Sequence, residues 1–180
     1  QPTVASDGPS GLDEALSAMG ASVDLGPVDE RAELVAEVTT ASSAVQAAAA
    51  ISAATTLDVA ATWLGEPGRS PLAGIAVVVD ASMADVLWIP ADELADEAVR
   101  RALGSHTDLR GHNVKPLMRS LLEFDVEVRG LTLDTAIAAY LIDPAEARYT
   151  LPDLIEKYTK FARPSDDVAG SGQLDLDGTS

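Results

Sequence analysis

The chain contains few residue types that could act as nucleophiles or bind metal ions. It has two histidines, His106 and His112, and no cysteine, which excludes thiolate metal sites, cysteine nucleophiles and disulfides. Neither histidine belongs to an HExxH pattern or to a His/Cys ligand spacing, so a zinc site is not indicated. A serine triad would need one of these histidines, but no GxSxG nucleophile elbow accompanies them. We therefore expect a loop position for His106 and a hydrogen-bonding role for His112.

Carboxylates are the remaining groups that could support catalysis, because the chain carries 29 Asp and Glu residues. Most of them lie where the start of a helix or a solvated helix face favours negative charge. Examples are Glu93, Asp96, Glu97, Asp153 and Glu156. Paired-carboxylate chemistry is thus the one catalytic class that the residue types leave open.

Several of the 12 basic residues gather in one stretch, namely Arg100, Arg101, Arg110, Lys115 and Arg119. They could contact a phosphate backbone, or they could form a solvated face that nearby carboxylates dilute. The formal net charge of the whole chain is −17 at pH 7. Because phosphate neutralisation supplies most of the affinity of nucleic-acid-binding domains, this charge argues against tight DNA binding by the chain alone.

A change from helical to alternating periodicity marks the strands that would position these side chains. Over 55–63, apolar residues at odd positions alternate with smaller or more polar ones, as in a half-buried strand. The turn signal Gly65-Glu66-Pro67-Gly68 follows it. An apolar run over 72–79 and a short strand over 86–89 complete an antiparallel three-stranded meander. We expect its middle strand to be buried on both faces.

Helical periodicity is found on both sides of these strands. The expected helices cover 29–38, 43–54, 92–103 and 114–123, and two more begin at the caps Asp134 and Thr150. Apolar spacing predicts an inner face for each later helix. For the helix over 92–103 it is Leu94, Ala98, Val99, Ala102 and Leu103, and for that over 114–123 it is Val114, Leu117, Met118, Leu121 and Leu122. The helix after Asp134 has Ile137, Ala138 and Leu141 on this face, and the helix after Thr150 has Leu151, Leu154, Ile155 and Tyr158. Strands followed by helices predict a mixed α/β domain of the α+β type.

Composition and length favour one globular domain with polar segments at both ends. The chain has 180 residues, 47% of them hydrophobic, and a mean hydropathy of +0.11. Residues 1–28 are interpreted as an interdomain linker with a short helix near 12–19, and residues 163–180 as a polar tail, around a domain over 29–162. No apolar run approaches the ~20 residues that span a bilayer. Because the chain begins with Gln1 and lacks the features of a signal peptide, we expect it to be cut from a longer, cytoplasmic protein.

Short motifs follow one another between Arg110 and Tyr158. They read G-[QH]-N-x-K, G-x-x-x-D-T, Y-x-[LI]-[ND]-P and L-x-x-L-x-x-x-Y. The residues that carry them are Gly111, His112, Asn113, Lys115, Gly130, Asp134, Thr135, Tyr140, Leu141, Asp143, Pro144, Leu151, Leu154 and Tyr158. In this order and spacing they resemble the 3′–5′ exonuclease domain of bacterial DNA polymerase I, a family A DNA polymerase. A weaker likeness extends over 57–176. The resemblance implies a ribonuclease H-like exonuclease fold, with a central mixed sheet flanked by helices.

The resemblance also implies where metal-binding carboxylates would stand. Active members of the family hold two divalent metals, which activate water and stabilise the leaving oxygen. Their first strand carries Asp-x-Glu, which corresponds here to Asp58 and Ala60, and no Glu occurs between residues 51 and 64. A further Asp corresponds to Leu117, and the last one lies past Ser180. Only Asp58 remains among the positions present, and one carboxylate cannot assemble a two-metal site.

The expected function is therefore that of a vestigial, non-catalytic exonuclease-like domain that serves as a structural platform in a DNA polymerase I of replication and repair. It would need no cofactor, whereas Mg²⁺ is expected for the parent polymerase. Its partners would be the polymerase and 5′-nuclease regions of the same parent chain, with DNA bound through the parent enzyme and no membrane contact. Two alternatives stay open: an active metal-dependent 3′–5′ exonuclease of DNA or RNA, and an acidic protein-interaction domain.

Overall fold

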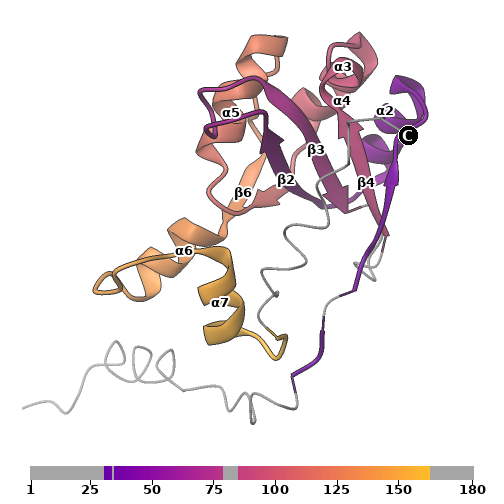
Figure 1. Cartoon of the computed structure of the whole chain (residues 1–180). Coiled ribbons are helices and arrows are strands. Elements are labelled where there is room, and N and C mark those ends of the chain that lie inside the picture. The colour runs from indigo at the N-terminus through magenta and orange to yellow at the C-terminus, as the bar shows by residue number, and fades with distance from the viewer. Residues whose placement is uncertain (1–30, 34, 79–84, 163–180) are drawn as a thin grey trace, which may run out of the picture.

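A six-stranded mixed sheet forms the centre of the computed structural model, which describes residues 31–33, 35–78 and 85–162 (Figure 1). Its strands are β1 (Glu37–Thr40), β2 (Leu57–Trp63), β3 (Leu72–Val78), β4 (Asp85–Pro90), β5 (Leu109–Gly111) and β6 (Leu131–Asp134). The helices are α2 (Ala44–Ala53), α3 (Ala91–Leu94), α4 (Glu97–Ser105), α5 (Lys115–Leu121), α6 (Thr135–Ile142) and α7 (Leu151–Tyr158), with a 3₁₀ turn at Leu122–Phe124. The expected mixed α/β class is confirmed.

The predicted meander is confirmed as the middle of this sheet. The strand order is β1-β4-β3-β2-β5-β6, and β2, β3 and β4 pair antiparallel with one another. The other three strands join in parallel, β1 to β4, β5 to β2 and β6 to β5. Parallel neighbours need long crossover connections, which here contain the helices. The alternation of residues in the sequence does not predict β1, β5 or β6, because each has only three or four residues.

The helix predicted over 29–38 is wrong. Within the described part of this segment, Glu37 begins β1, and the side chains of Val35 and Val38 are exposed. Val38, Thr39 and Thr40 are β-branched, which favours an extended backbone. Strand β4 supplies the parallel hydrogen-bonding partner that a lone segment lacks, with Val38 opposite Val86. Tertiary pairing thus overrides the helical pattern predicted for this segment.

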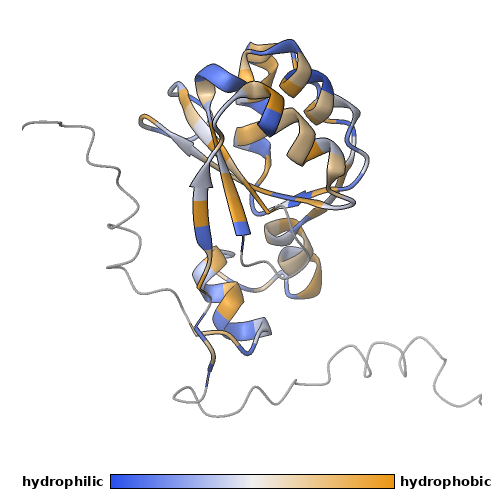
Figure 2. Cartoon of the chain, turned by 90° about the vertical axis from the view of Figure 1, so that its right-hand side faces the viewer, coloured by the Kyte–Doolittle hydropathy of each residue, from blue (hydrophilic) through white to orange (hydrophobic). Residues whose placement is uncertain are grey.

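One face of the sheet carries the core. Its inward side chains include Leu57 and Val59 of β2, Ile75 and Val77 of β3, and Ile89 of β4. They form one buried cluster with residues of α2, α4 and α5, namely Ala47, Ile51, Val99, Ala102, Leu103, Leu117 and Leu121. Figure 2 shows hydrophobic residues along the central strands and on the helices that pack against them. On the other face of β3, Leu72 and Gly74 are buried whereas Ala76 and Val78 are half-buried, so the expected burial on both faces is confirmed only for the first part of the strand.

The helix predicted over 92–103 is interrupted. It divides into α3 and α4, because the Asp96 side chain accepts a hydrogen bond from the Ala98 amide at 2.7 Å and starts a new helix there. Leu94, Val99 and Leu103 are buried as predicted, but Ala98 is exposed. In the next helix, Val114 precedes α5 and Leu122 is exposed at the 3₁₀ turn that ends it.

The inner faces predicted for the last two helices are mostly wrong. Asp134 and Thr150 cap α6 and α7 as expected. However, Ile137 and Leu141 of α6 are exposed, Leu141 by 72%. Leu154 is the buried residue of α7, while Leu151 and Tyr158 are exposed. The two helices contact each other, and α6 contacts β6 at the edge of the sheet. Among the described residues, no second layer covers these exposed side chains.

Parts of the predicted organisation lie outside the described residues. These are the linker over 1–28 with its short helix near 12–19, and the tail over 163–180. The domain predicted over 29–162 is described from residue 31 onward, except for residues 34 and 79–84. Among the described residues no helix is long and apolar enough to cross a membrane.

Candidate functional site: a groove on the open face of the sheet

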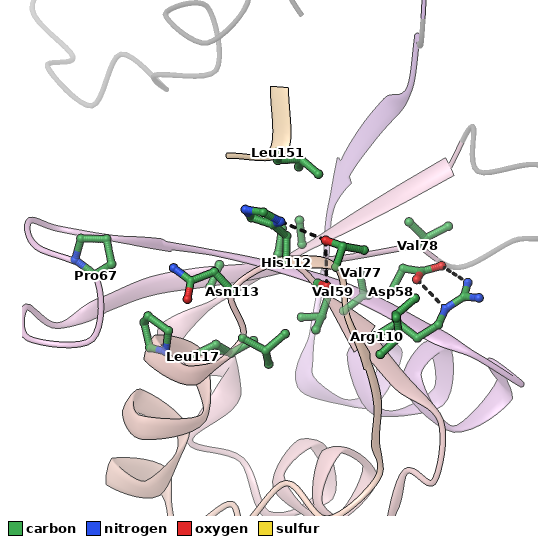
Figure 3. Close-up of a pocket in the computed structure, with 18 of the residues that line it drawn as sticks. Asp58, Val59, Pro67, Val77, Val78, Arg110, His112, Asn113, Leu117 and Leu151 are labelled. Atoms are coloured by element: carbon green, nitrogen blue, oxygen red, sulfur yellow. Dashed lines mark hydrogen bonds and ion pairs between the residues drawn. The ribbon is translucent and has the colours of Figure 1, made fainter. Parts of the chain in front are cut away.

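The face of the sheet opposite the core forms the floor of a groove. Because side chains alternate along a strand, Asp58 and Ala60 of β2 point to this face together. Beside them lie Ala76 and Val78 of β3 and Val86 of β4, and the groove has a volume of about 720 Å³. Its rim is formed by β5, the turn after it, α5, β6, α6 and α7, with Arg110, His112, Asn113, Pro116, Leu133, Thr135 and Leu151 among its residues. Figure 3 shows Asp58 and Arg110 on one side of the groove and Pro67 on the opposite side.

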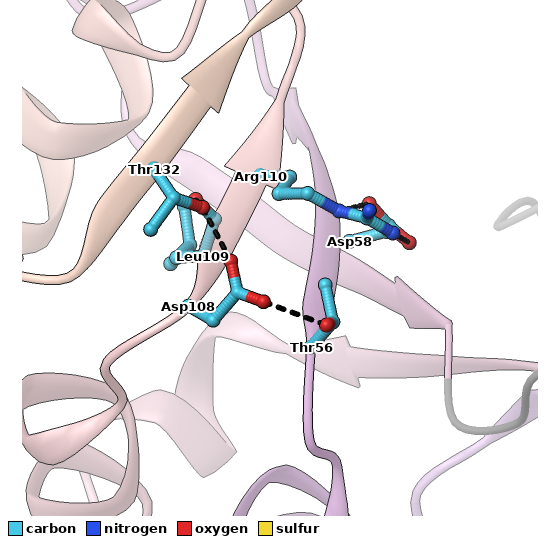
Figure 4. Close-up of polar contacts among 6 residues, drawn as sticks. All are labelled: Thr56, Asp58, Asp108, Leu109, Arg110 and Thr132. Atoms are coloured by element: carbon cyan, nitrogen blue, oxygen red, sulfur yellow. Dashed lines mark hydrogen bonds and ion pairs between the residues drawn. The ribbon is translucent and has the colours of Figure 1, made fainter.

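Asp58, the one family ligand expected to remain, is bound to arginine. Arg110 of β5 donates from Nε to Asp58 Oδ1 at 2.8 Å and from a terminal nitrogen to Asp58 Oδ2 at 2.6 Å (Figure 4). The parallel register of β2 and β5 places the two residues opposite each other. Hydrogen bonding to the carboxylate raises the pKa of Arg110 above its ordinary value. This bidentate geometry uses both oxygens of Asp58, which a metal would otherwise need.

The other two family positions supply no ligand atom. Ala60 is exposed on the groove floor, and Leu117 is 3% exposed within the core. Asp58 is the only carboxylate on β2, so a shift in the alignment along this strand would not complete an Asp-x-Glu pair. Within the described ranges, no three His, Cys, Asp or Glu side chains are close enough to hold a metal ion. The residues present therefore do not fit a two-metal centre.

Asp134 joins two of the matched motifs. Its Oδ1 accepts from the amides of Asn113 and Ala136, both at 2.9 Å, and its Oδ2 accepts from Val114 at 2.8 Å. Asn113 has a positive φ of 49°, so its amide turns toward this carboxylate. Burial favours the neutral acid, but these backbone donors outweigh it, so the pKa of Asp134 lies below its ordinary value. Asp134 thus caps α6 and holds the turn before α5.

His112 and Thr135 form a second link between the same motifs. Nδ1 of His112 lies 2.9 Å from Thr135 Oγ1, and that hydroxyl donates to the Gly111 carbonyl at 3.4 Å. Burial lowers the pKa of His112, although the negative charge of Asp134 opposes the change. Burial thus favours the neutral imidazole at the rim of the groove, and the expected hydrogen-bonding role of His112 is confirmed by its contact with Thr135.

The pH dependence of stability should report on His112. Because its pKa is lower in the folded state, the unfolded chain binds a proton first as the pH falls below about 6.5. The free energy of unfolding is therefore expected to decrease between about pH 7 and about pH 5.5, and to decrease less in His112→Gln. Urea unfolding of both proteins at the two pH values measures this difference. Identical decreases would show that His112 does not contribute.

Other residues of the matched motifs pack against neighbouring groups or are exposed. A Cβ on Gly111 would lie 2.9 Å from the Val59 carbonyl oxygen, so only glycine fits against β2. Tyr140 meets Tyr149 edge to face with ring centroids 5.9 Å apart. Leu154 is buried, Tyr158 lies beneath the Lys157 ammonium at 5.6 Å, and Lys115 is exposed.

A polar cluster at the start of β5 is not indicated by any sequence motif. Asp108 accepts hydrogen bonds from Thr56 Oγ1 at 2.7 Å, just before β2, and from Thr132 Oγ1 of β6 (Figure 4). The Thr132 hydroxyl lowers the pKa of Asp108 most, followed by that of Thr56. The Asp108 amide donates to His106 Nδ1 at 3.3 Å, and His106 Nε2 lies 3.0 Å from the Ala54 carbonyl. His106 lies in the loop between α4 and β5, as expected, and is half-buried and hydrogen-bonded there.

Three of the five basic residues between Arg100 and Arg119 form ion pairs with carboxylates. Arg100 pairs with Asp125, Arg101 with Glu97, and Arg110 with Asp58. Lys115 and Arg119 are exposed on α5. This arrangement does not gather the five side chains into one positive surface.

No family model and no curated protein matches the sequence. The POL domain of Pol1 from M. smegmatis, in complex with DNA primer-template and dNTP, is similar with a TM-score of 0.53 and 26% identity over 67% of this chain. The likeness spans 22% of that structure's length.

Two other solved structures share the architecture at lower identity. The catalytic core of RRP6 from Trypanosoma brucei matches with a TM-score of 0.52 and 14% identity, covering 87% of this chain and 45% of that one. Brucella melitensis NrnC matches with a TM-score of 0.50 and 13% identity, covering 74% of this chain and 63% of that one. These likenesses and the mixed sheet show that the chain has the ribonuclease H-like exonuclease fold expected from its motifs.

Proposed function

We propose that the chain is a catalytically silent 3′–5′ exonuclease-like domain of a DNA polymerase I, which serves as a structural platform in the parent enzyme. The observation that carries this proposal is the state of Asp58. Its two oxygens are engaged by Arg110, and the neighbouring family positions hold Ala60 and Leu117. A two-metal mechanism needs several oxygen ligands around each ion, whereas Asp58, the carboxylate that lines this groove among the described residues, is already engaged by Arg110.

Two observations support the assignment to a DNA polymerase I. The motif series from Gly111 to Tyr158 resembles the polymerase I exonuclease domain. The similarity to the M. smegmatis Pol1 structure, at 26% identity, covers 67% of this chain. We infer a cytoplasmic parent enzyme with a 5′-nuclease region before this domain and a polymerase region after it. The parent would bind DNA and Mg²⁺, whereas this domain would need no cofactor. The coding sequence on either side of the chain checks this arrangement directly.

Titration of Mn²⁺ into the purified chain, followed by calorimetry, tests the loss of the metal site. We expect weak, non-specific heats that are the same for the wild type and for Asp58→Asn. This variant keeps the shape of the side chain and removes its charge. A digestion assay with end-labelled single-stranded DNA on the same samples is expected to leave the DNA intact.

Specific Mn²⁺ binding that Asp58→Asn abolishes, together with release of nucleotides from the 3′ end, would contradict the proposal. That result would favour an active metal-dependent exonuclease of DNA or RNA. Intact DNA with an unrelated coding sequence on both sides would instead favour an acidic protein-interaction domain.

A further inference from the structure

Helices α6 and α7 form an arm at one edge of the sheet. They follow β6, the last strand at that edge, and they lie apart from the helices that pack on the core (Figure 1). Within the arm, α6 contacts β6, and α7 contacts α6. Leu151, the first residue of α7, lines the groove on the open face of the sheet (Figure 3). The position of α7 therefore affects the shape of the groove.

The far end of the arm is bound to a segment from the start of the domain. Ala32 forms an isolated parallel bridge with Phe161, which follows α7. The Ala32 amide donates to the Lys160 carbonyl at 3.2 Å, and the Ala32 carbonyl accepts from the Ala162 amide at 2.9 Å. These two backbone hydrogen bonds lie outside the six-stranded sheet, so they join the arm to a different part of the chain.

Arg31 adds a bond from the same segment to α7 itself. One of its terminal nitrogens donates to the Glu156 carbonyl oxygen at 2.7 Å. Glu156 lies in the last turn of α7, where carbonyl groups lack amide partners within the helix and a cation is favoured. The Nε atom of Arg31 is buried without an acceptor among the described residues, which offsets part of this gain. Because few bonds hold it, this attachment can open without unfolding of the core.

The segment that holds the arm leads directly to the opposite edge of the sheet. Strand β1 begins at Glu37, five residues after Ala32, and a chain of this length spans at most about 18 Å. Strands β1 and β6 are the two edges of the six-stranded sheet, which lie about 24 Å apart at the usual spacing between strands. The arm and the segment together therefore connect both edges. Without the attachment, the arm is held at β6 alone.

From this geometry we propose that residues 31–33 are a releasable latch. The closed latch makes the arm a strap between the two edges of the sheet and fixes α7 beside the groove. When the latch opens, α7 moves away together with Leu151, and the groove becomes wider. The inference concerns a conformational device within the fold, and it does not depend on the proposed loss of catalysis.

Distance measurements between two spin labels test the latch, since the chain has no cysteine of its own. Arg148→Cys is exposed shortly before α7, and Val45→Cys is 76% exposed on α2, so one label reports on the arm and the other on the core helices. We expect one narrow distance distribution in this background. Arg31→Ala should add a second, longer distance. Arg69→Ala removes an arginine that pairs with Glu66 in the turn after β2, and this matched control should leave the distribution unchanged.

Hydrogen exchange followed by mass spectrometry gives a second readout in the chain without labels. The amides of α7 should exchange about five- to tenfold faster in Arg31→Ala, as expected for the loss of one hydrogen bond to the end of the helix. The amides of β2 and β3 should keep their wild-type rates. A disulfide formed between Ala32→Cys and Phe161→Cys should slow the exchange of α7 relative to the reduced form of the same double variant.

Three results would overturn the inference. Faster exchange of α7 with an unchanged label distance would mean that Arg31 only caps this helix. Wild-type exchange and wild-type distances in Arg31→Ala would mean that the segment does not hold the arm. Faster exchange of β2 and β3 to the same extent as α7 would mean that Arg31 supports the whole fold rather than a local latch.

Discussion

Replacement of Asp134 by alanine is expected to lower the free energy of unfolding by about 3 kcal/mol or more, because buried donors lose a charged acceptor. The amides of Asn113, Val114 and Ala136 all donate to this carboxylate, which is itself 9% exposed. Without it, α6 loses its cap and the turn at Asn113, with its positive φ, loses its anchor. Urea unfolding at pH 7 measures the loss.

Two further variants test whether the loss of stability in Asp134→Ala comes from its hydrogen bonds. Asp134→Asn keeps one oxygen acceptor but turns a donor toward the Val114 amide, so we expect an intermediate loss. Glu123→Ala removes an exposed carboxylate and should change stability by less than about 0.5 kcal/mol. Since the pKa of Asp134 is lowered by folding, its stabilisation should be present above about pH 4 and be lost as the pH falls through the folded value. A wild-type stability in Asp134→Ala would contradict the structural role.

Gly130→Ala is expected to destabilise the domain by about 3 kcal/mol or more, because the added methyl group would overlap the backbone of a neighbouring segment. A Cβ at Gly130 would clash with the carbonyl oxygen of His106 and lie 2.7 Å from Thr107 Cα. Both neighbours are backbone atoms that precede β5, so they cannot move aside as a flexible side chain would. The midpoint of urea unfolding measures the effect.

Gly104→Ala provides the matched control for this substitution. Gly104 lies inside α4, and a Cβ there would have only the Glu127 carbonyl oxygen nearby, at 3.9 Å. Because alanine is the better helix former, this variant should gain up to about 1 kcal/mol. Opposite signs for the two variants are the expected result. Equal effects would mean that the loss of chain flexibility, rather than the close approach at Gly130, decides the outcome.

Both predictions concern residues of the motif series that resembles a nuclease. The structure explains Gly111, Asn113, Asp134 and Thr135 by close packing, by a left-handed backbone and by hydrogen bonds between β5, α5 and α6. None of these roles needs a metal ion or a substrate. A domain of this fold can therefore keep these motifs after its catalytic carboxylates are gone, which is consistent with the proposed platform role.

The meander and the helix caps could be predicted from the sequence because their signals are local. Alternation of apolar residues specifies the strands around Leu57 and Leu72, and Ser43, Asp134 and Thr150 each accept a hydrogen bond from an amide within the next three residues. Such patterns depend on backbone geometry over a few residues, which is the same in every fold. The lack of a carboxylate at positions 60 and 117 is likewise a property of the sequence alone.

Only the tertiary structure decided which faces are covered and which distant groups meet. The spacing of Ile137 and Leu141 on α6 shows that they share a side of the helix, but both are exposed because no described element packs there. Asp58 and Arg110 are far apart in the sequence, and only the parallel pairing of β2 and β5 makes them an ion pair. Periodicity determines which side chains point the same way, whereas their partners depend on the order of strands in the sheet.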